Sequence, residues 1–411
     1  MMEFAEFILE HEGDDLGRLA LARDRFLSLL PEFDLALTTL EVRAKLRRKV
    51  PEWYAQPALR YPLRVSGEQC SSSATARYKA SVALAACGGA SAQASFRLAD
   101  LTGGLGVDSW AFAERFSEVL YNEMRPDLSD AARRNFAALG LSGVRVRNAE
   151  CRPGHLQEIL ADFVPDMIYL DPARRASDGR KVFRLEDCQP AVPELLPELF
   201  AACPLLLLKL SPMADISLVC KQLGHVREVH VVAAEGECKE LLLLLERDWS
   251  GPYALTVVED GAVMALPADA ASPTPACSAI TLPGSLLFEP GKALLKAGAF
   301  DLPCRFGLAK LGRHTHLYAG TEVPSSLRPF GKVFRILEAV PLSKRSIKEL
   351  GARYPRAEVS ARNLPLSSDQ LRAKLHVLSG GAVHIFGVKI DGEGNYLLST
   401  CSEEDTPGTR G

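Results

Sequence analysis

Asp100, Glu123 and Asp171 each stand at the end of a short apolar run. Runs of this length predict buried strands, and the segments between them carry apolar residues at helical spacing. In an open α/β sheet, ligands bind outside the carboxyl ends of the strands. A carboxylate in that position can accept two hydrogen bonds from a vicinal diol, or take a proton from a reacting group. Residues 96–175 therefore predict an acidic ligand crevice at the edge of such a sheet.

A glycine-rich turn, Asp100-Leu-Thr-Gly-Gly-Leu-Gly106, follows the first of these strands. Glycines let the backbone turn sharply and approach a ligand closely. A dinucleotide site needs G-x-G-x-x-G, but no glycine lies three residues after Gly106. The turn instead resembles motif I of class I S-adenosylmethionine-dependent methyltransferases, D-x-G-x-G-x-G, with Thr102 in place of the first glycine. A plain βα turn in another doubly wound fold is the alternative.

The later strand ends agree with this resemblance. Glu123 lies 17 residues after Gly106, where a carboxylate accepts both ribose hydroxyls of a cofactor. The third predicted strand, residues 144–148, runs into Glu150, where methyltransferases place an acid that accepts the adenine amino group. The resemblance implies S-adenosyl-L-methionine as cofactor and eight binding residues: Lys79, Asp100, Thr102, Gly104, Gly106, Glu123, Asn148 and Glu150.

The fourth predicted strand ends in Asp171-Pro172-Ala173-Arg174, which marks the acceptor side. Methyl transfer from a sulfonium needs no metal, because the carbon is already electrophilic and the protein mainly aligns the acceptor. Asp171 can take or orient the acceptor proton, and Pro172 stiffens the turn. Enzymes that methylate base amines usually carry an aromatic residue at the fourth place, which stacks on a flipped base. Arg174 stands there instead, able to stack on a base or hold a phosphate, and it weakens the case for an amine acceptor.

The bulk composition indicates a globular chain of several domains. A length of 411 residues predicts two to four domains, and 47% hydrophobic residues allow a sizeable core. The first residues are acidic where a signal peptide would be basic, and no apolar run reaches membrane length. Ten cysteines without a C-x-x-C pair argue against a zinc site or disulfides and favour a reducing cytoplasm. Cys151 and Cys203 are candidate nucleophiles by position only, and a buried thiol is the favoured interpretation of Cys151.

Residues 1–85 predict an N-terminal helical region. Its most unusual part is a hydroxyl-rich run, residues 68–80, that leads into a helix carrying Lys79. A Ser or Thr helix cap explains part of this run. The alternative, favoured by the resemblance, is that Gln69, Thr75 and Lys79 close over the cofactor carboxylate or the substrate.

Residues 86–250 predict the methyltransferase domain itself. Two final strands, residues 228–234 and 239–247, are joined by a connection of hairpin length. Seven strands that end in a hairpin match the methyltransferase sheet, whose last strand is antiparallel, whereas a plain NAD-binding domain lacks that ending. The predicted fold class is α/β: a Rossmann-like seven-stranded methyltransferase sheet, with the N-terminal helical region and small α+β modules at the C-terminus.

The C-terminal part predicts two modules, residues 280–325 and 328–402. His314 and His316 lie in the first without a partner at metal-ligand spacing, so no metal is expected. In the second, residues 328–374 hold eleven Lys or Arg against four acids, although the whole chain has a net charge of −3. A basic surface of this kind attracts phosphates in a salt-dependent manner. A solvated basic module with another partner is the alternative.

Most of the chain resembles a bacterial family of class I methyltransferases with ferredoxin-like and THUMP-like domains at the C-terminus. The matching pieces are residues 68–80, 100–109, 171–175, 288–299 and 360–375. THUMP domains in related enzymes hold structured RNA, so the resemblance implies a cytoplasmic enzyme that methylates RNA (tRNA or rRNA) and has no membrane partner. Two other classes remain open: a non-catalytic RNA-binding protein that retains the fold, and a small-molecule methyltransferase.

Overall fold

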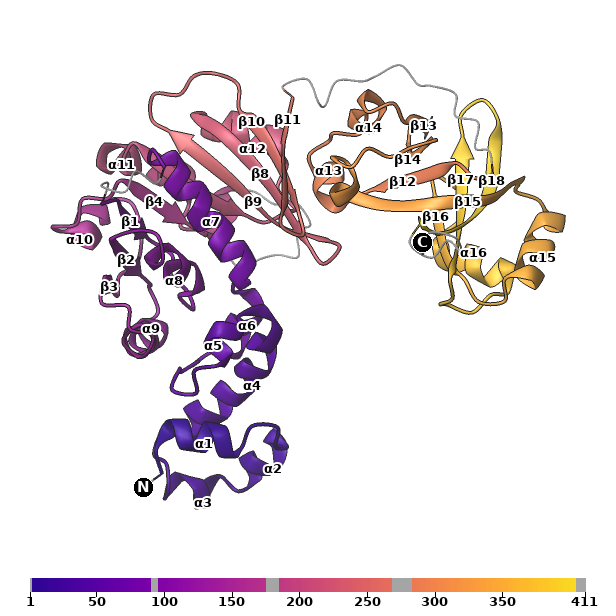
Figure 1. Cartoon of the computed structure of the whole chain (residues 1–411). Coiled ribbons are helices and arrows are strands. Elements are labelled where there is room, and N and C mark those ends of the chain that lie inside the picture. Colours follow the sequence, from indigo (N-terminus) through magenta and orange to yellow (C-terminus); the bar gives the residue numbers. More distant parts are fainter. Residues whose placement is uncertain (1, 90–94, 175–184, 268–282, 404–411) are drawn as a thin grey trace. The chain divides into compact units, whose positions relative to one another are not determined.

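The structure is a computed structural model that describes residues 2–89, 95–174, 185–267 and 283–403 (Figure 1). The chain divides into two compact units. The first comprises Met1–Val229 and Glu240–Tyr253, and the second comprises His230–Lys239 and Ala254–Gly411. The candidate site lies within the first unit.

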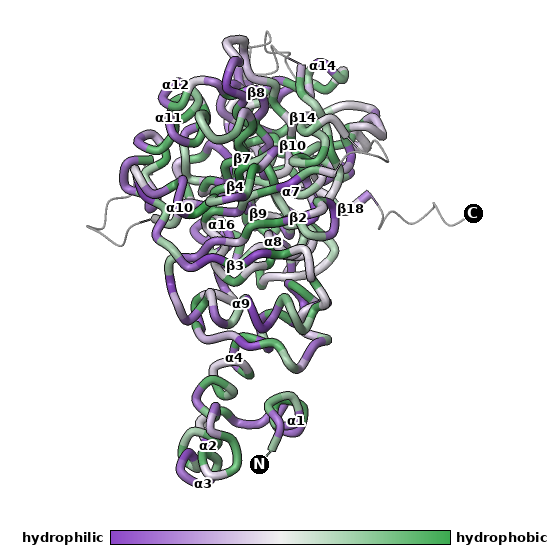
Figure 2. Tube along the Cα trace, turned by 90° about the vertical axis from the view of Figure 1, so that its left-hand side faces the viewer, coloured by the Kyte–Doolittle hydropathy of each residue, from purple (hydrophilic) through white to green (hydrophobic). Residues whose placement is uncertain are grey.

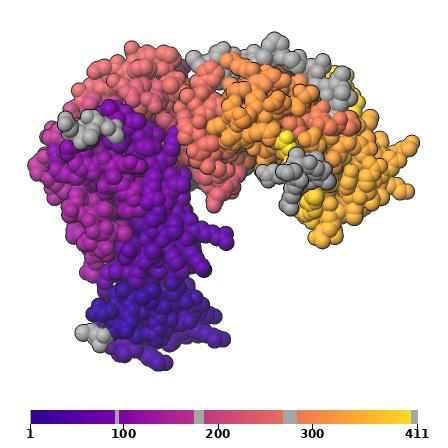
Figure 3. Space-filling model, viewed as in Figure 1, coloured from indigo at the N-terminus to yellow at the C-terminus, as the bar shows by residue number. Residues whose placement is uncertain are grey.

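The described residues 2–89 form seven helices. They are α1 (Phe4–Glu10), α2 (Leu16–Leu21), α3 (Arg23–Leu27), α4 (Phe33–Lys49), α5 (Pro51–Tyr54), α6 (Arg64–Gln69) and α7 (Ser73–Ala86). Helices α1–α4 form a lobe at the N-terminus, coloured indigo in Figure 3, around a core that includes the fully buried Phe7 and Phe33. Burial of such large apolar side chains is the main force that holds short helices together.

Helix α7 begins with a capping box. Ser72 Oγ accepts a hydrogen bond from the Thr75 backbone N–H, and the Thr75 hydroxyl accepts one from the Ser72 N–H. Such reciprocal bonds satisfy backbone donors that would otherwise have no partner at a helix start. The expectation that Thr75 closes over a ligand is therefore not supported, because its hydroxyl is engaged in starting the helix.

The first unit contains most of seven strands of a nine-stranded sheet, in the order β8-β9-β7-β4-β1-β2-β3. Its strands are β1 (Arg97–Asp100), β2 (Glu118–Asn122), β3 (Val144–Arg147), β4 (Met167–Leu170), β7 (Leu205–Leu210), β8 (Val226–Ala234) and β9 (Glu237–Glu246). The strands from β7 to β3 along this order are parallel, and β9 is antiparallel to β7. Figure 2 shows hydrophobic residues in the central strands β4 and β7, as expected for strands covered on both faces. The predicted Rossmann-like α/β fold is confirmed.

Helices and short elements connect these strands. They are α8 (Val107–Ala113), α9 (Pro126–Ala138), α10 (Leu156–Leu160), β5 (Ala173–Arg174), η1 (Leu185–Asp187), β6 (Cys188–Gln189), α11 (Val192–Ala202) and α12 (Ile216–Leu223). Strands β5 and β6 pair with each other and form a small sheet beyond the end of β4. This arrangement brings residue 189 next to the carboxyl edge of the large sheet.

The second unit contains the end of the β8–β9 hairpin, residues 230–239, beside the antiparallel pair β10 (Ala254–Glu259) and β11 (Ala262–Leu266). These two strands follow the seven that the sequence predicted. The unit also holds a separate seven-stranded sheet with the order β13-β14-β12-β15-β18-β17-β16. Its elements are β12 (Leu286–Pro290), α13 (Lys292–Lys296), α14 (Leu302–Arg305), β13 (Ala309–Gly312), β14 (Thr315–Gly320), η2 (Arg328–Phe330), β15 (Gly331–Pro341), α15 (Lys344–Arg353), β16 (Glu358–Arg362), α16 (Ser368–Leu375), β17 (Val383–Ile390) and β18 (Gly394–Ser402).

The two C-terminal modules expected from the sequence share this one sheet. Strand β12, from residues 280–325, pairs antiparallel with β15, from residues 328–402. One buried core includes Leu287 and Leu317 from the first region and Phe386 and Leu398 from the second. None of the helices in the described ranges is long and apolar enough to cross a membrane.

Candidate active site

A cavity of about 350 Å³ lies at the carboxyl edge of the first unit's sheet. Its volume falls in the range of small-molecule and cofactor sites. Of the predicted cofactor-binding and acceptor-side residues, six line it: Thr102, Gly104, Gly106, Glu123, Glu150 and Asp171. The further candidates Gln69 and Cys151 line it as well. Lys79, Asp100, Asn148 and Pro172 do not line it. The side chain of Arg174 lies outside the described residues.

The glycine turn forms one wall of the cavity. Gly104 and Gly106 have φ values of 53° and 93°, a left-handed conformation that glycine adopts without strain. The Tyr121 hydroxyl donates a hydrogen bond of 2.6 Å to the Gly104 carbonyl. The ring of Tyr121 packs so closely that a Cβ on Gly103 would lie 2.1 Å from it. The sequence of this turn is therefore required by close packing as well as by its backbone angles.

Gly103→Ala is expected to destabilise the fold by about 1–3 kcal/mol, because the buried Tyr121 ring must move to admit the methyl group. The moved ring would displace Gly104, so affinity for the cofactor should fall as well. Thermal unfolding and calorimetric titration measure the two effects. Gly140→Ala is the control: its Cβ meets nothing within 4 Å, although its φ is +72°. That variant should lose about 1–2 kcal/mol of stability through strain alone and bind cofactor normally. Unchanged cofactor affinity in Gly103→Ala would contradict a binding role for the turn.

Glu123 lies across the turn from the acceptor side, with only 8% of its surface exposed. Its two carboxylate oxygens accept hydrogen bonds of 2.9 Å from the backbone N–H groups of Gly104 and Arg125. Each oxygen keeps a free lone pair, because a carboxylate oxygen can accept two hydrogen bonds. The carboxylate is thus already oriented to receive the two hydroxyls of a vicinal diol.

Asn148, predicted to bind cofactor, holds Glu123 in place instead. Its side-chain amide donates hydrogen bonds to the backbone carbonyls of Glu123 and Met124, at 2.7 and 3.1 Å. The amide nitrogen of Asn148 therefore donates its hydrogen bonds to the backbone that connects β2 to α9. Asn148 acts on the cavity through the strand end that it fixes.

Asp100 supports the turn from within the core. It is 1% exposed and accepts hydrogen bonds from the Thr102 N–H and from the Ser109 hydroxyl. Burial raises the pKa of Asp100 to about 8, although both hydrogen bonds act in the opposite direction. The carboxyl group is therefore a brace between the turn and α8 and does not face a ligand.

The far end of the cavity combines the end of β3 with the paired strands β5 and β6. Glu150 is exposed there, and one of its oxygens accepts a hydrogen bond of 3.0 Å from the Gln189 side chain. Gln189 and Pro190 line the same wall, and sequence reasoning missed both because nothing in their spacing marks a site. An adenine ring at this end would meet an acid held in place by an amide.

Neither candidate cysteine has the properties of a nucleophile. Burial raises the pKa of Cys151 to about 12 and that of Cys203 to about 11. A thiol of that pKa carries almost no thiolate at neutral pH, and the thiolate is the reactive form. The favoured interpretation of Cys151 as a buried thiol agrees with these values.

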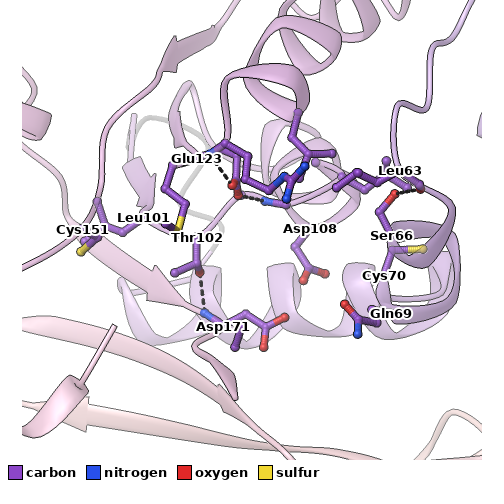
Figure 4. Close-up of a pocket in the computed structure, with 18 of the residues that line it drawn as sticks. Leu63, Ser66, Gln69, Cys70, Leu101, Thr102, Asp108, Glu123, Cys151 and Asp171 are labelled. Atoms are coloured by element: carbon purple, nitrogen blue, oxygen red, sulfur yellow. Dashed lines mark hydrogen bonds between the residues drawn. The ribbon is translucent and has the colours of Figure 1, made fainter. Parts of the chain in front are cut away.

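Asp171 closes the cavity on the acceptor side. Its backbone N–H donates a hydrogen bond of 2.6 Å to the Thr102 hydroxyl, which ties the end of β4 to the glycine turn. Its side chain is 36% exposed and forms an ion pair with Lys209 of β7. Figure 4 shows the Asp171 and Asp108 carboxylates and the Gln69 amide directed toward the same space. Pro172 is buried directly behind Asp171.

A mostly buried group of polar side chains lies beside the cavity, with Ser71 and Asp108 in its wall, and we name it the ion cluster. It consists of Ser71, Lys79, Asp108, Tyr169, Lys209 and Glu240. Lys79, fully buried, contacts both Glu240 oxygens at 2.8 and 2.9 Å and one Asp108 oxygen at 3.3 Å. The second Asp108 oxygen accepts hydrogen bonds from the hydroxyls of Ser71 and Tyr169. Lys79 therefore supports the site from below and does not face the cavity.

The charges of this cluster offset the cost of burial. Burial alone would raise the pKa of Asp108, but Lys79 and Lys209 outweigh it and hold the pKa below its ordinary value. Burial alone would likewise lower the pKa of Lys209. The carboxylates of Asp171, Glu240 and Asp108 outweigh that effect and raise it above the ordinary value. Lys209 therefore remains a cation beside Asp171.

The fold and this crevice together define a class I methyltransferase architecture, and comparison with known proteins agrees. Residues 286–326 match the family model of a ferredoxin-like domain, and residues 331–402 match that of a THUMP domain-like region. A curated Mycobacterium tuberculosis protein, described as an uncharacterized S-adenosylmethionine-dependent methyltransferase, is 26% identical over 282 residues, which cover 68% of this chain and 73% of that one. A crystal structure of a putative methyltransferase from Porphyromonas gingivalis W83 is 29% identical, covers 97% of both chains and superimposes with a TM-score of 0.82.

The chain is an S-adenosylmethionine-dependent methyltransferase, with ferredoxin-like and THUMP-like regions at its C-terminus. The sequence prediction of enzyme class and cofactor is thereby confirmed. The roles of individual residues stay predictions.

Proposed function

We propose that this enzyme methylates RNA, either tRNA or rRNA, which the THUMP-like region helps to bind. The carrying observation is the charge of two neighbouring helices, α15 and α16. Lys344, Lys348 and Lys374 on these helices are exposed. Within the described ranges none of the three forms an ion pair, and the nearby carboxylates Glu349 and Asp369 pair with arginines instead. Exposed lysines without an ion-pair partner are suited to contact a phosphate backbone.

The geometry of the cavity supports specific roles for its residues. S-adenosylmethionine supplies, when bound, a methyl group on a sulfonium. Glu123 would accept the ribose hydroxyls, the glycine turn would surround the amino-acid part, and Glu150 would accept the adenine amino group. Asp171 would then contact the methyl acceptor, on the side of the glycine turn away from Glu123. We also propose a division of the chain into four domains. They are the N-terminal helical region 1–85, the methyltransferase domain 86–250, the ferredoxin-like domain 280–325 and the THUMP-like domain 328–402.

The test of this function is methyl transfer to RNA by the whole chain. Methyl-labelled S-adenosylmethionine and total RNA from cells that lack the protein are incubated with it, and the modified nucleosides are mapped by mass. We expect label in one class of structured RNA and none in DNA. Label in no RNA, together with normal cofactor binding, would favour a small-molecule acceptor.

Replacing Lys344 and Lys348 together by glutamine is expected to weaken RNA binding about tenfold near physiological salt. Each lysine removed from a phosphate contact should also reduce the slope of log affinity against log salt by about 1. Filter binding at several salt concentrations measures both quantities. Lys221→Gln on α12, also exposed, serves as the control and should change neither. An unchanged salt slope in the double variant would remove α15 from the RNA surface.

We also propose a cytoplasmic location, supported by the dispersed cysteines of the sequence.

A further inference from the structure

The carboxylate of Asp171, on the side of the cavity proposed for the methyl acceptor, has a cationic partner. The Lys209 ammonium forms an ion pair with Asp171 at the end of the cavity where a methyl acceptor would stand. The side chain of Lys209 is 14% exposed, and its partner Asp171, rather than Lys209 itself, lines the cavity. The carboxylates around Lys209 keep it protonated. Any acceptor atom that approaches Asp171 therefore also approaches a fixed positive charge.

The positive charge of Lys209 is balanced by the carboxylates of the ion cluster. Glu240 on β9 holds Lys79 with both of its oxygens, and its negative charge also acts on Lys209. Without Glu240 the two lysines would repel each other in a region of low dielectric constant. The cluster thus keeps the Lys209 cation next to the Asp171 carboxylate. Removing these charged groups from water costs free energy, and a purely apolar core would not have that cost.

A fixed cation distinguishes between two kinds of acceptor. An amine nitrogen becomes more positive as it attacks a methyl group, so an adjacent ammonium would slow that reaction. A hydroxyl oxygen must lose its proton to become a good nucleophile, and an adjacent ammonium stabilises the negative charge that develops. The Asp171–Lys209 pair therefore favours an oxygen acceptor.

The walls of the cavity agree with this choice. Among the described residues that line it, none is aromatic. Enzymes that act on a flipped base stack it between aromatic or apolar side chains. Besides apolar residues such as Leu63 and Leu101, the cavity presents the polar groups of Asp108, Asp171 and Gln69. Polar groups of this kind suit a sugar better than a base.

We propose that the acceptor is the 2′-hydroxyl of a ribose in RNA, and that Lys209 and Asp171 activate it as a pair. This inference rests on the proposed RNA methyltransferase function. As the hydroxyl oxygen forms its bond to the methyl carbon, the proton of the hydroxyl passes to the Asp171 carboxylate. The carbon–sulfur bond breaks at the same time, and its electron pair stays on sulfur as a neutral thioether. Asp171 then releases the proton to water. The 2′-hydroxyl is also the group that separates RNA from DNA.

The test uses the alkali stability of the product. Alkali cleaves RNA through the free 2′-hydroxyl, so a methylated 2′-oxygen leaves a dinucleotide that resists cleavage, whereas a methylated base leaves a mononucleotide. The full chain labels total RNA from cells that lack it, and the RNA is then hydrolysed. We expect the label in alkali-stable dinucleotides. Label in mononucleotides would overturn the inference and leave the proposed function standing. Absence of label from RNA would overturn the proposed function, and the inference with it.

Variants of Lys209 test the role of the cation. Lys209→Met is expected to lower kcat at least a hundredfold and to leave the Kd for S-adenosylmethionine unchanged, which also shows that the variant folds. Lys209→Arg keeps the charge and should recover at least a tenth of the wild-type kcat. The exposed Lys221→Met is the matched control. Wild-type kcat in Lys209→Met, or equal losses in the methionine and arginine variants, would show that the charge plays no part.

Discussion

Glu123→Gln is expected to weaken binding of S-adenosylmethionine about a hundredfold. The glutamine side chain keeps the shape of glutamate but has one oxygen instead of two. Charge-assisted hydrogen bonds contribute about 1.5–3 kcal/mol each, and the substitution weakens two of them, one to each ribose hydroxyl. A loss of about 3 kcal/mol corresponds to that factor in Kd. Isothermal titration of the purified chain measures it, with Glu158→Gln as control, because Glu158 is exposed on α10 and lies outside the cavity.

A second measurement separates ribose recognition from damage to the turn, since Glu123 also accepts from the Gly104 N–H. The wild-type chain should bind a cofactor analogue with one ribose hydroxyl removed at least tenfold more weakly than the cofactor itself. Glu123→Gln should bind the two with nearly equal affinity, because the group that distinguishes them is gone. Full discrimination in the variant would assign Glu123 a structural role only.

The sequence predicted the position of a site residue correctly where that residue ends a strand and its side chain faces the cavity. Glu123, Glu150 and Asp171 were predicted from strand ends, and all three line the cavity. A strand end fixes the position of its last residue in any parallel sheet, so sequence spacing is sufficient to predict this much. The same reasoning placed Asp100 and Asn148 in the site but could not tell which way they point. In the structure one braces the turn and the other holds the Glu123 backbone.

The ion cluster was missed because it joins residues that are distant in sequence. Lys79 and Glu240 contact each other across 161 positions. One signal was available: Lys209 stands within a strand of leucines, and Glu240 precedes five of them. A charge in a strand that is otherwise fully apolar is costly unless it has a partner. Two such charges of opposite sign in neighbouring strands predict a buried pair or a functional site, although neither alone indicates which carboxylate Lys209 meets.

Asp171→Asn is expected to lower kcat for RNA methylation by a factor of about 10²–10⁴, the usual contribution of a positioned acid or base. Asparagine has nearly the same shape, and the backbone N–H of residue 171 can still donate to Thr102. Affinity for S-adenosylmethionine should therefore stay within about threefold of wild type. Single-turnover transfer and calorimetric titration measure the two quantities. Asp162→Asn is the control, because Asp162 belongs to an exposed ion pair with Arg145 that contributes little.

This substitution also tests the nature of the acceptor. Both an amide carbonyl and a carboxylate can accept a hydrogen bond from an amine. An enzyme that methylates an amine should therefore tolerate asparagine at position 171. A hydroxyl acceptor needs a base, and asparagine cannot take its proton. The variant also removes the negative partner of Lys209 while Glu240 and Asp108 remain nearby, so the cation should stay in place without the group that receives the proton. A large loss of kcat with intact cofactor binding supports proton transfer to Asp171, whereas near-normal turnover would mean that this carboxylate only orients the acceptor.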